Sequence, residues 1–416
     1  MNPLLYRRQF LIVREKLSVL SKWQLLSIGR YFLYVHPDLE MTTVENSDKK
    51  IILLGYIFDT IQYKSSNSEI LNKLITTTED FNSLVISLKS FVGRFVLIYI
   101  DNKSFNIIQD ALALREVYYS KSNNLVICGS QPNILVNFSN PLIKESKDPL
   151  LNDFKCFQSP QVREGRLWVG DSTAFEGVKH LLPNHFLDLL TLESHRYWPN
   201  TPLPRIELDD AVAKCSSFLQ GALKAVAHRH QLMMAITAGF DSRVLLAASR
   251  DLRGSIYYFI NKIDELNEQH PDIKIPKEIF KRIGIDFHVH EYSKDVPDDF
   301  REIYFKNTYF SRETLLPVIH NIYYKNHSEK MNILGVGEIG RTKFYDEPNK
   351  VTPYYLSYML HHRKSPFAVN ECEKWLLASK DIAHQYGLNI MTLFWWEILI
   401  GNWGSVGNSE SDIAIE

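Results

Sequence analysis

The chain has 416 residues, enough for two domains of ordinary size with a large buried core. Hydrophobic residues make up 45% and charged residues 23%, a mixture typical of globular proteins. The 47 Lys and Arg balance 48 Asp and Glu, which argues against a dedicated nucleic-acid binder, because such proteins carry an excess or patch of positive charge.

The first half is predicted to be rich in β-strands. Short apolar runs with many β-branched and aromatic residues recur there, separated by turn residues such as Asp, Asn and Ser. One helix is expected at 67–75, where the apolar residues have helical spacing. The expected strands occupy residues 51–57, 94–100, 125–128, 186–190 and 196–198.

A cluster of prolines at 199, 202 and 204 precedes a long expected helix at 207–228, so we place a domain boundary between 1–199 and 200–416. Strands and helices then alternate, which predicts an α/β fold with a doubly wound parallel sheet. Ligands of such sheets lie at the carboxyl ends of the strands. The expected strands are 232–236, 256–260, 285–290 and 331–334, and the expected helices are 243–250 and 276–283, the latter starting at Pro276 and stopped by Gly284.

Three observations bear on location and chemistry. The N-terminus has no apolar stretch followed by a small-residue cleavage site, so we expect no signal peptide and a cytoplasmic protein. The apolar run from Met391 to Ile400 contains Glu397 and is far shorter than the roughly 20 residues that span a membrane, so it is expected in the core. The four cysteines are widely spaced and form no C-x-x-C pair, which favours buried thiols over zinc ligands or disulfides: Cys128, Cys156, Cys215 and Cys372.

The loop between the first strand of the parallel sheet and its helix carries the candidate site. Backbone amides at a helix start favour an anion, and small residues there let a ligand approach closely. Asp241 would repel a bare phosphate, but it fits a Mg²⁺ ion that bridges to pyrophosphate oxygens. From the residues alone, a tight turn capped by Asp or Ser is the alternative. The candidate binding residues are Ile236, Thr237, Ala238, Gly239, Phe240, Asp241, Ser242 and Arg243.

The segment Thr237–Ser242 resembles the S-G-G-x-D-S pyrophosphate loop of ATP pyrophosphatases, in the form found in glutamine-dependent asparagine synthetases. Gly93–Asp101 is similar to the G-x-F-A-x-x-x-x-D strand of their glutaminase domain, and Asp110–Tyr119 to its D-x-x-G-x-R-P-L-Y-Y run. Leu182–His185 and then Tyr197–Trp198 match the segments that close that domain. The resemblance covers nearly the whole chain and implies a glutaminase-like β-sandwich flanked by helices, followed by an ATP-pyrophosphatase domain.

The resemblance also implies ATP and Mg²⁺ as cofactors. The segment at 333–338 corresponds to the family's S-G-x-G-x-D-E loop, so Glu338 is implied to hold Mg²⁺ together with Asp241, although its spacing is one residue short. Gly335 and Gly337 belong to the same implied ATP site, where Ile236 and Gly335 would border the adenine and ribose. From the residues alone, this segment is a common turn after a strand.

Two further acidic residues are candidates by resemblance. Glu397 resembles the Glu of a Tyr–Glu pair that acts as the base in related β-lactam synthetases; a cap or salt bridge is the alternative. Asp272 resembles an acidic residue that follows the second strand in the family and touches the nucleotide site; a turn-forming Asp is the alternative.

The sequence departs from the family at its glutaminase residues. Residue 2 is Asn2 where the family has a catalytic Cys, and Leu54-Gly55-Tyr56 replaces the N-G-E motif. We therefore expect no glutamine hydrolysis, as in β-lactam and lasso-peptide macrolactam synthetases. In the family, a stretch like Ser409–Glu416 leads into E-x-R-x-P-F and helices with a catalytic lysine, so the resemblance implies truncation at the C-terminus.

These patterns predict an ATP-dependent amide-forming ligase. It would adenylate a small-molecule or peptide carboxylate, release pyrophosphate, and pass the acyl group to an amine or ammonia with loss of AMP. A catalytically inactive relative that binds nucleotide or a partner protein is the main alternative. A sulfur- or tRNA-modifying enzyme is less favoured, because the chain has no basic patch or paired cysteines. The oligomeric state is left open.

Overall fold

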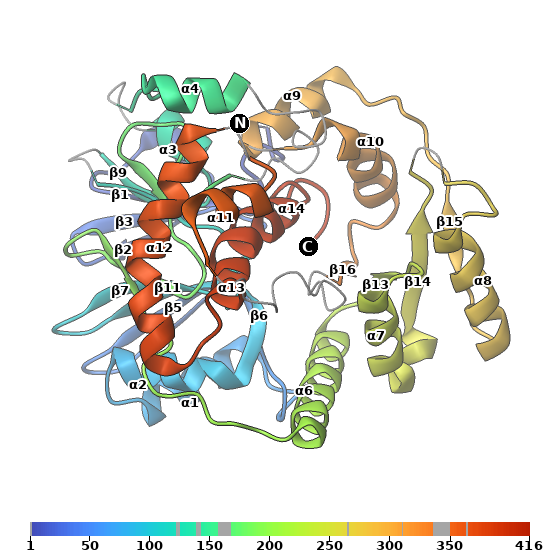
Figure 1. The fold of residues 1–416 in the computed structure, drawn as a ribbon. Helices are drawn as coiled ribbons and strands as arrows, with labels where there is room; N and C mark the ends of the chain where they lie inside the picture. The colour runs from blue at the N-terminus through green and yellow to red at the C-terminus, as the bar shows by residue number, and fades with distance from the viewer. Residues whose placement is uncertain are drawn as a thin grey trace.

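The computed structural model describes residues 2–121, 125–138, 143–156, 168–263, 266–309, 311–335, 350–362 and 365–416. The protein is a mixed α/β molecule with two antiparallel sheets and one parallel sheet (Figure 1). Its strands are β1 (Phe10–Val13), β2 (Gln24–Ile28), β3 (Tyr31–Val35), β4 (Met41–Glu45), β5 (Lys50–Asp59), β6 (Phe91–Ile100), β7 (Phe105–Gln109), β8 (Tyr118–Ser120), β9 (Val126–Gly129), β10 (Val178–His180), β11 (His185–Asp188), β12 (Glu193–Arg196), β13 (Leu232–Ala235), β14 (Ile256–Asn261), β15 (His288–His290) and β16 (Met331–Ile333).

Helices cover the sheets and end the chain. They are α1 (Asn67–Thr77), α2 (Phe81–Ser87), α3 (Pro132–Phe138), α4 (Pro149–Cys156), α6 (Leu208–Arg229), α7 (Phe240–Ala248), α8 (Pro271–Ile283), α9 (Asp298–Asn307), α10 (Leu316–Val318), α11 (Pro353–Met359), α12 (Pro366–Tyr386), α13 (Ile390–Phe394) and α14 (Ser405–Ser409). Two segments are π-helical, Ile319–Tyr324 and Trp395–Gly404.

The antiparallel sheets pack face to face as a sandwich. Their strand orders are β10-β8-β9-β1-β3-β2 and β12-β11-β7-β6-β5-β4. One buried cluster joins them, with Phe10 and Leu33 from the first sheet against Ile52 and Ile98 from the second. Strands β5 and β6 pair over ten positions each, from Lys50 opposite Ile100 to Asp59 opposite Phe91. This strand pair is the longest in the second sheet.

The outer faces of the sandwich are covered by helices from different parts of the chain. Helix α1, which starts with a capping box between Ser66 and Glu69, packs with α2 on the second sheet. The first sheet is covered by α11, α12, α13, α14 and the π-helical segment Trp395–Gly404, whose buried residues form one cluster with those of the strands (Figure 1). The C-terminal helices therefore share a core with the first half of the chain, although the expected boundary near residue 200 separates them in sequence.

The third sheet has the order β15-β14-β13-β16, and all three of its strand pairs are parallel. The predicted parallel sheet is therefore present. Helix α6 connects it to the sandwich, because Leu223 and Val226 lie in one cluster with Tyr56 of β5 and Met234 of β13. The chain order reverses between β13 and β16, and such a switch point is where open α/β sheets bind ligands.

Several boundaries differ from the sequence-based expectations. Helix α8 starts at Pro271, with His270 as its cap, so Pro276 lies inside the helix and not at its start. Gly284 ends α8 in the left-handed conformation, as expected. The strand expected at 196–198 is β12 at Glu193–Arg196, and the strand expected at 285–290 forms only at its end, as β15. Among the described residues, no helix combines the length and hydropathy needed to cross a bilayer.

A buried cluster of charges lies between the antiparallel sandwich and the segment that follows α14. Arg94 of β6 makes a two-pronged ion pair with Asp412, at 2.7 and 2.9 Å. Arg8 and Arg115 contact Glu416, at 3.0 and 3.3 Å. Burial acts to raise the pKa of Glu416, but the three arginines outweigh it and hold that pKa well below its usual value. These contacts fix the chain's last residues beside the sandwich.

Candidate functional site

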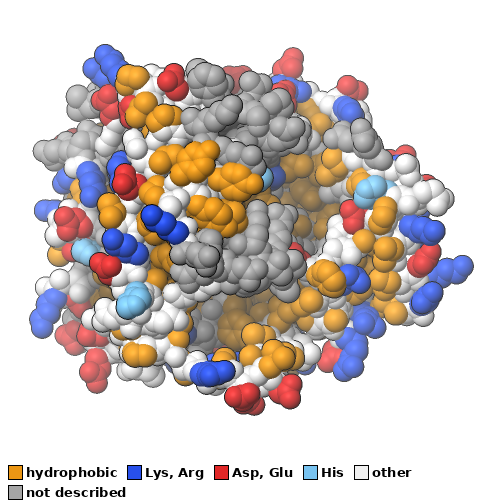
Figure 2. All heavy atoms as spheres, in the orientation of Figure 1, with side chains coloured by type: hydrophobic (Ala, Val, Ile, Leu, Met, Phe, Trp, Pro, Cys, Tyr) orange, Lys and Arg blue, Asp and Glu red, His pale blue; other side chains and the backbone are white. Residues whose placement is uncertain are grey.

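The loops that follow β13 and β16 meet at a cavity of about 310 Å³, at the switch point of the parallel sheet. The other wall comes from the segment after α9 and from the C-terminal helices. Figure 2 shows that this face of the molecule is hollowed between the antiparallel sandwich and the parallel sheet. The described residues that line the cavity are Ala235, Thr237, Gly239, Asp241, Ser242, Arg312, Leu334, Gly335, Trp403, Gly404, Gly407 and Asn408.

Hydrogen bonds within the 237–243 loop fix its shape. The Thr237 N–H donates to Ser242 Oγ at 3.0 Å, and the Gly239 N–H donates to Thr237 Oγ1 at 3.2 Å. The Ala238 N–H donates to an Asp272 carboxylate oxygen at 2.9 Å. Asp272 therefore contacts the loop and braces it from α8. The hydroxyls of Thr237 and Ser242 are used to shape the turn.

Helix α7 begins at Phe240, directly beside the cavity. Gly239 precedes it, and among the described residues no side chain caps this helix start. The amides of the first turn, from Phe240 to Ser242, have no partner within the helix and carry the positive end of its dipole. The start of α7 is thus suited to a negatively charged group, such as a phosphate.

Gly335 brings the second loop into contact with the first. A Cβ atom built at residue 335 would lie 3.0 Å from Asp241 Cβ and 3.4 Å from the Ser242 nitrogen. Any larger residue would therefore push the two loops apart. The sequence-based expectation placed Gly335 in the same site as Asp241, and the structure brings these two residues together.

Arg312 is a cavity residue that the sequence analysis missed. Its guanidinium pairs with Glu410 of the segment after α14, and its backbone N–H donates to the same carboxylate at 2.9 Å. Burial acts to lower the pKa of Arg312, but the Glu410 charge raises it above its usual value, so the guanidinium stays charged. Its R-E-T-L-L-P context has no recognisable motif, and only the fold brings it to the cavity.

Four predicted residues of the loop do not line the cavity: Ile236, Ala238, Phe240 and Arg243. Ile236 is fully buried in the core around the parallel sheet, so its side chain cannot border an adenine or ribose as expected. Phe240 is exposed, and the Arg243 guanidinium lies 4.8 Å from its ring centroid. The Arg243 Nε–H donates to the Gly239 carbonyl, so this side chain lies against the outside of the helix start.

Gly337 and Glu338 lie outside the described residues, so their expected roles in binding ATP and Mg²⁺ stay predictions. Asp241 is the only acidic side chain among the described residues that line the cavity. A Mg²⁺ ion that arrives on phosphates needs only one or two protein carboxylates. A single carboxylate, that of Asp241, therefore fits an ion carried by a nucleotide. Within the described ranges, no group of three or more His, Cys, Asp or Glu is placed to hold a metal by itself.

Glu397 has a role other than the expected one. Its fully buried carboxylate accepts two bonds from Arg196 and one each from Asn184 and Trp375, all at 2.8 Å. Burial acts to raise its pKa, but the Arg196 bonds outweigh that effect and lower the pKa below its usual value. A carboxylate so engaged cannot take a proton from an amine. The salt-bridge alternative describes Glu397, and the base role is not retained.

Comparisons with known proteins add little to this geometry. No family model matches the sequence, and no curated protein matches it. Among solved structures, glutamine phosphoribosylpyrophosphate amidotransferase from B. subtilis, complexed with ADP and GMP, is 11% identical, with a TM-score of 0.27 over 61% of this chain and 60% of that one. A structure described as the allosteric regulatory enzyme of purine biosynthesis is 12% identical, with a TM-score of 0.28 over 66% and 65%. This chain thus spans less than two thirds of either protein, and scores this low do not establish a shared fold.

Proposed function

We propose that the cavity at the switch point binds ATP with Mg²⁺ and that the protein is an ATP-dependent amide-forming ligase of the asparagine synthetase type. The observation that carries the proposal is the meeting of Asp241, the uncapped start of α7 and Gly335 at one cavity. A lone helix start would be weak support. Here the resemblance of the same loop to a pyrophosphate loop coincides with a cavity at the carboxyl ends of parallel strands.

In the proposed reaction, an oxygen of the substrate carboxylate attacks the α-phosphorus of ATP. The bond from that phosphorus to the bridging oxygen breaks, giving an acyl-adenylate and pyrophosphate. The lone pair of an amine then attacks the acyl carbon, AMP leaves, and the amine proton passes to solvent or to a base. Mg²⁺ would neutralise pyrophosphate oxygens.

The chain's own residues would align the nucleotide and neutralise its charge. The first-turn amides of α7 would hold pyrophosphate oxygens, and Asp241 would hold the metal. Arg312, kept in place by Glu410, would add positive charge on the opposite wall. Residues 404 and 407 in that wall are glycines, which leaves room for a ligand.

The proposal includes no glutamine hydrolysis. Where the resemblance places the N-G-E motif, the chain has Leu54-Gly55-Tyr56 in β5. A Cβ atom at residue 55 would lie 2.3 Å from the Arg94 carbonyl oxygen and 2.9 Å from Arg115 Nε, so the backbone of β6 and one arginine side chain fill the space beside this glycine. With the N-G-E motif replaced and this space filled, we expect the nitrogen to come from an amine on the acceptor or from free ammonia.

A catalytically inactive, nucleotide-binding relative is the second candidate. The structural role of Glu397 favours it, because the expected base is engaged elsewhere. The two candidates differ in turnover. AMP and pyrophosphate formed in equal amounts from ATP, in a panel of amino-acid, uronate and peptide carboxylates with an amine, would support the ligase. Saturable binding of ATP without AMP formation across that panel would support the inactive relative.

A further inference from the structure

A second cavity, of about 460 Å³, lies apart from the 237–243 loop and shares no lining residue with the cavity there. It forms between the outer face of the second antiparallel sheet, the turn after β7, helix α6 and the π-helical segment. Its volume falls in the range of small-molecule sites, about 300–1,000 Å³. We propose that this cavity binds a small amphipathic carboxylate with a flat apolar body.

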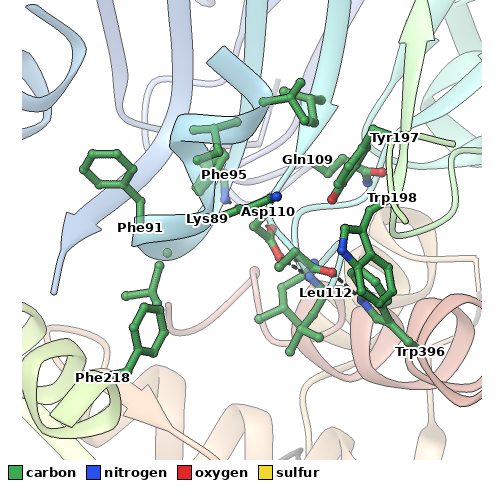
Figure 3. A pocket seen from close by; sticks show the side chains of 17 residues that line it. Lys89, Phe91, Phe95, Gln109, Asp110, Leu112, Tyr197, Trp198, Phe218 and Trp396 are labelled. Atoms are coloured by element: carbon green, nitrogen blue, oxygen red, sulfur yellow. Dashed lines mark hydrogen bonds between the residues drawn. The ribbon is translucent and has the colours of Figure 1, made fainter. Parts of the chain in front are cut away.

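Aromatic side chains form the walls. Trp198 and Trp396 stand edge to face, with ring centroids 5.5 Å apart, and the Trp396 indole N–H donates to the Ala111 carbonyl at 2.6 Å. Phe91 of β6 and Phe218 of α6 lie across the cavity from them (Figure 3). Rings held in this way prefer a flat apolar or aromatic body, which they contact on several sides.

The polar groups of the cavity select the ends of such a ligand. Asp110 is engaged, because its carboxylate accepts the backbone N–H groups of Phe95, Leu112, Leu114 and Arg115 at 3.0–3.3 Å. It therefore shapes the turn after β7. The Lys89 side chain projects among the lining residues (Figure 3), and within the described residues it has no recorded ion pair. Its ammonium suits a carboxylate at the rim.

Gln109 supplies the inner polar group. It is 4% exposed, its Nε2 donates to the Arg115 carbonyl at 3.0 Å, and its Oε1 has no hydrogen-bond partner among the residues that the structure describes. A buried acceptor without a donor costs free energy, so a ligand that brings an N–H or O–H group to it is favoured. The broad terminal torsion of Gln allows the small turn that this bond needs. The cavity thus fits a flat ligand that places an N–H or O–H donor at Gln109 and a carboxylate at the rim beside Lys89.

The test is calorimetric titration of the full chain with indole-3-acetate, which has an N–H donor, a flat ring and a carboxylate. We expect saturable binding below about 1 mM. Binding should weaken about tenfold for the N-methylated probe, which lacks the donor, and about tenfold in Lys89→Gln. Neutral 3-methylindole should bind Lys89→Gln and the unmodified protein alike, and Phe218→Ser should weaken both probes.

Exposed Lys22, away from the cavity, provides the matched control, and Lys22→Gln should leave all affinities unchanged. A non-cleavable ATP analogue with Mg²⁺ should not compete with indole-3-acetate, because the two cavities are separate. The proposal is overturned by no saturable binding of either indole at millimolar concentration. It is equally overturned by indole-3-acetate binding that Lys89→Gln and Phe218→Ser leave unchanged.

Discussion

Glu397 illustrates how the partners of a buried carboxylate determine its role. Its place in an apolar run identified it as a residue of special function, and the run is indeed buried. Sequence could not reveal that Arg196, Asn184 and Trp375, all distant along the chain, would converge on it. A buried carboxylate needs such partners, and which ones it finds depends on tertiary contacts.

We expect Glu397→Gln to destabilise the protein by about 3 kcal/mol, because it leaves the Arg196 guanidinium without its buried counter-charge. Urea unfolding followed by fluorescence measures this effect. Exposed Glu373 on α12 gives the control, and Glu373→Gln should change the free energy of unfolding by less than about 0.5 kcal/mol. An unchanged stability in Glu397→Gln, together with lost turnover, would instead restore the base role.

Gly335 acts through the space that it leaves free. In Gly335→Ala, the new Cβ atom would press on Asp241 at 3.0 Å and separate the two loops of the cavity. We expect the affinity for a Mg²⁺–ATP analogue to fall about tenfold, equivalent to about 1.4 kcal/mol. Gly254→Ala is the matched control, since a Cβ atom at residue 254 meets nothing within 4 Å. Equal affinities of the two variants would argue against a nucleotide between these loops.

At the scale of elements, the spacing of apolar residues correctly predicted the strands and helices whose sequences carry one strong pattern. Strands β5, β6, β9, β13, β14 and β16 and helices α1 and α6 formed where apolar spacing placed them. The start of α8 was missed because Pro276 looked like a first residue, whereas Pro271 takes that place and Pro276 lies inside the helix. The lining of the cavity by Trp403 and Asn408 depends on how the C-terminal helices return to the parallel sheet, which no local pattern encodes.

Helix α6 depends on one close approach. A Cβ atom at Gly221 would lie 2.0 Å from the Thr60 carbonyl oxygen, at the end of β5. Gly221→Ala should therefore destabilise the protein by about 1–3 kcal/mol, although alanine favours helices. Thermal unfolding checks this, with Ser216→Ala on the exposed part of α6 as the control. A stabilised Gly221→Ala would show that α6 does not pack on β5 as described.

At the scale of the whole molecule, buried titratable groups make folding depend on pH. His180 lies fully buried between Tyr118, on which it stacks at 4.5 Å, and Glu116. Burial lowers its pKa to about 4, whereas an unfolded histidine titrates near 6.5. The unfolded chain thus binds more protons between these values, so stability present above about pH 6.5 is lost as pH falls toward 4.

We therefore expect His180→Phe, which keeps a ring against Tyr118, to lose less stability on acidification than the unmodified protein. The difference should be about 2 kcal/mol between pH 7 and pH 5, measured by urea unfolding at both values. Exposed His228 on α6 gives the control, and His228→Gln should follow the unmodified protein. Identical acid sensitivity in His180→Phe would mean that His180 titrates normally in the folded state.

The proposed ligase activity requires ATP to bind where the loops after β13 and β16 meet. Calorimetric titration with a non-cleavable ATP analogue, with and without Mg²⁺, tests it most directly in the unmodified protein, in Asp241→Asn and in the exposed control Asp286→Asn. We predict Mg²⁺-dependent binding that Asp241→Asn weakens at least about tenfold and Asp286→Asn leaves unchanged. Absence of binding in the unmodified protein, or binding indifferent to both Mg²⁺ and Asp241, would contradict the account.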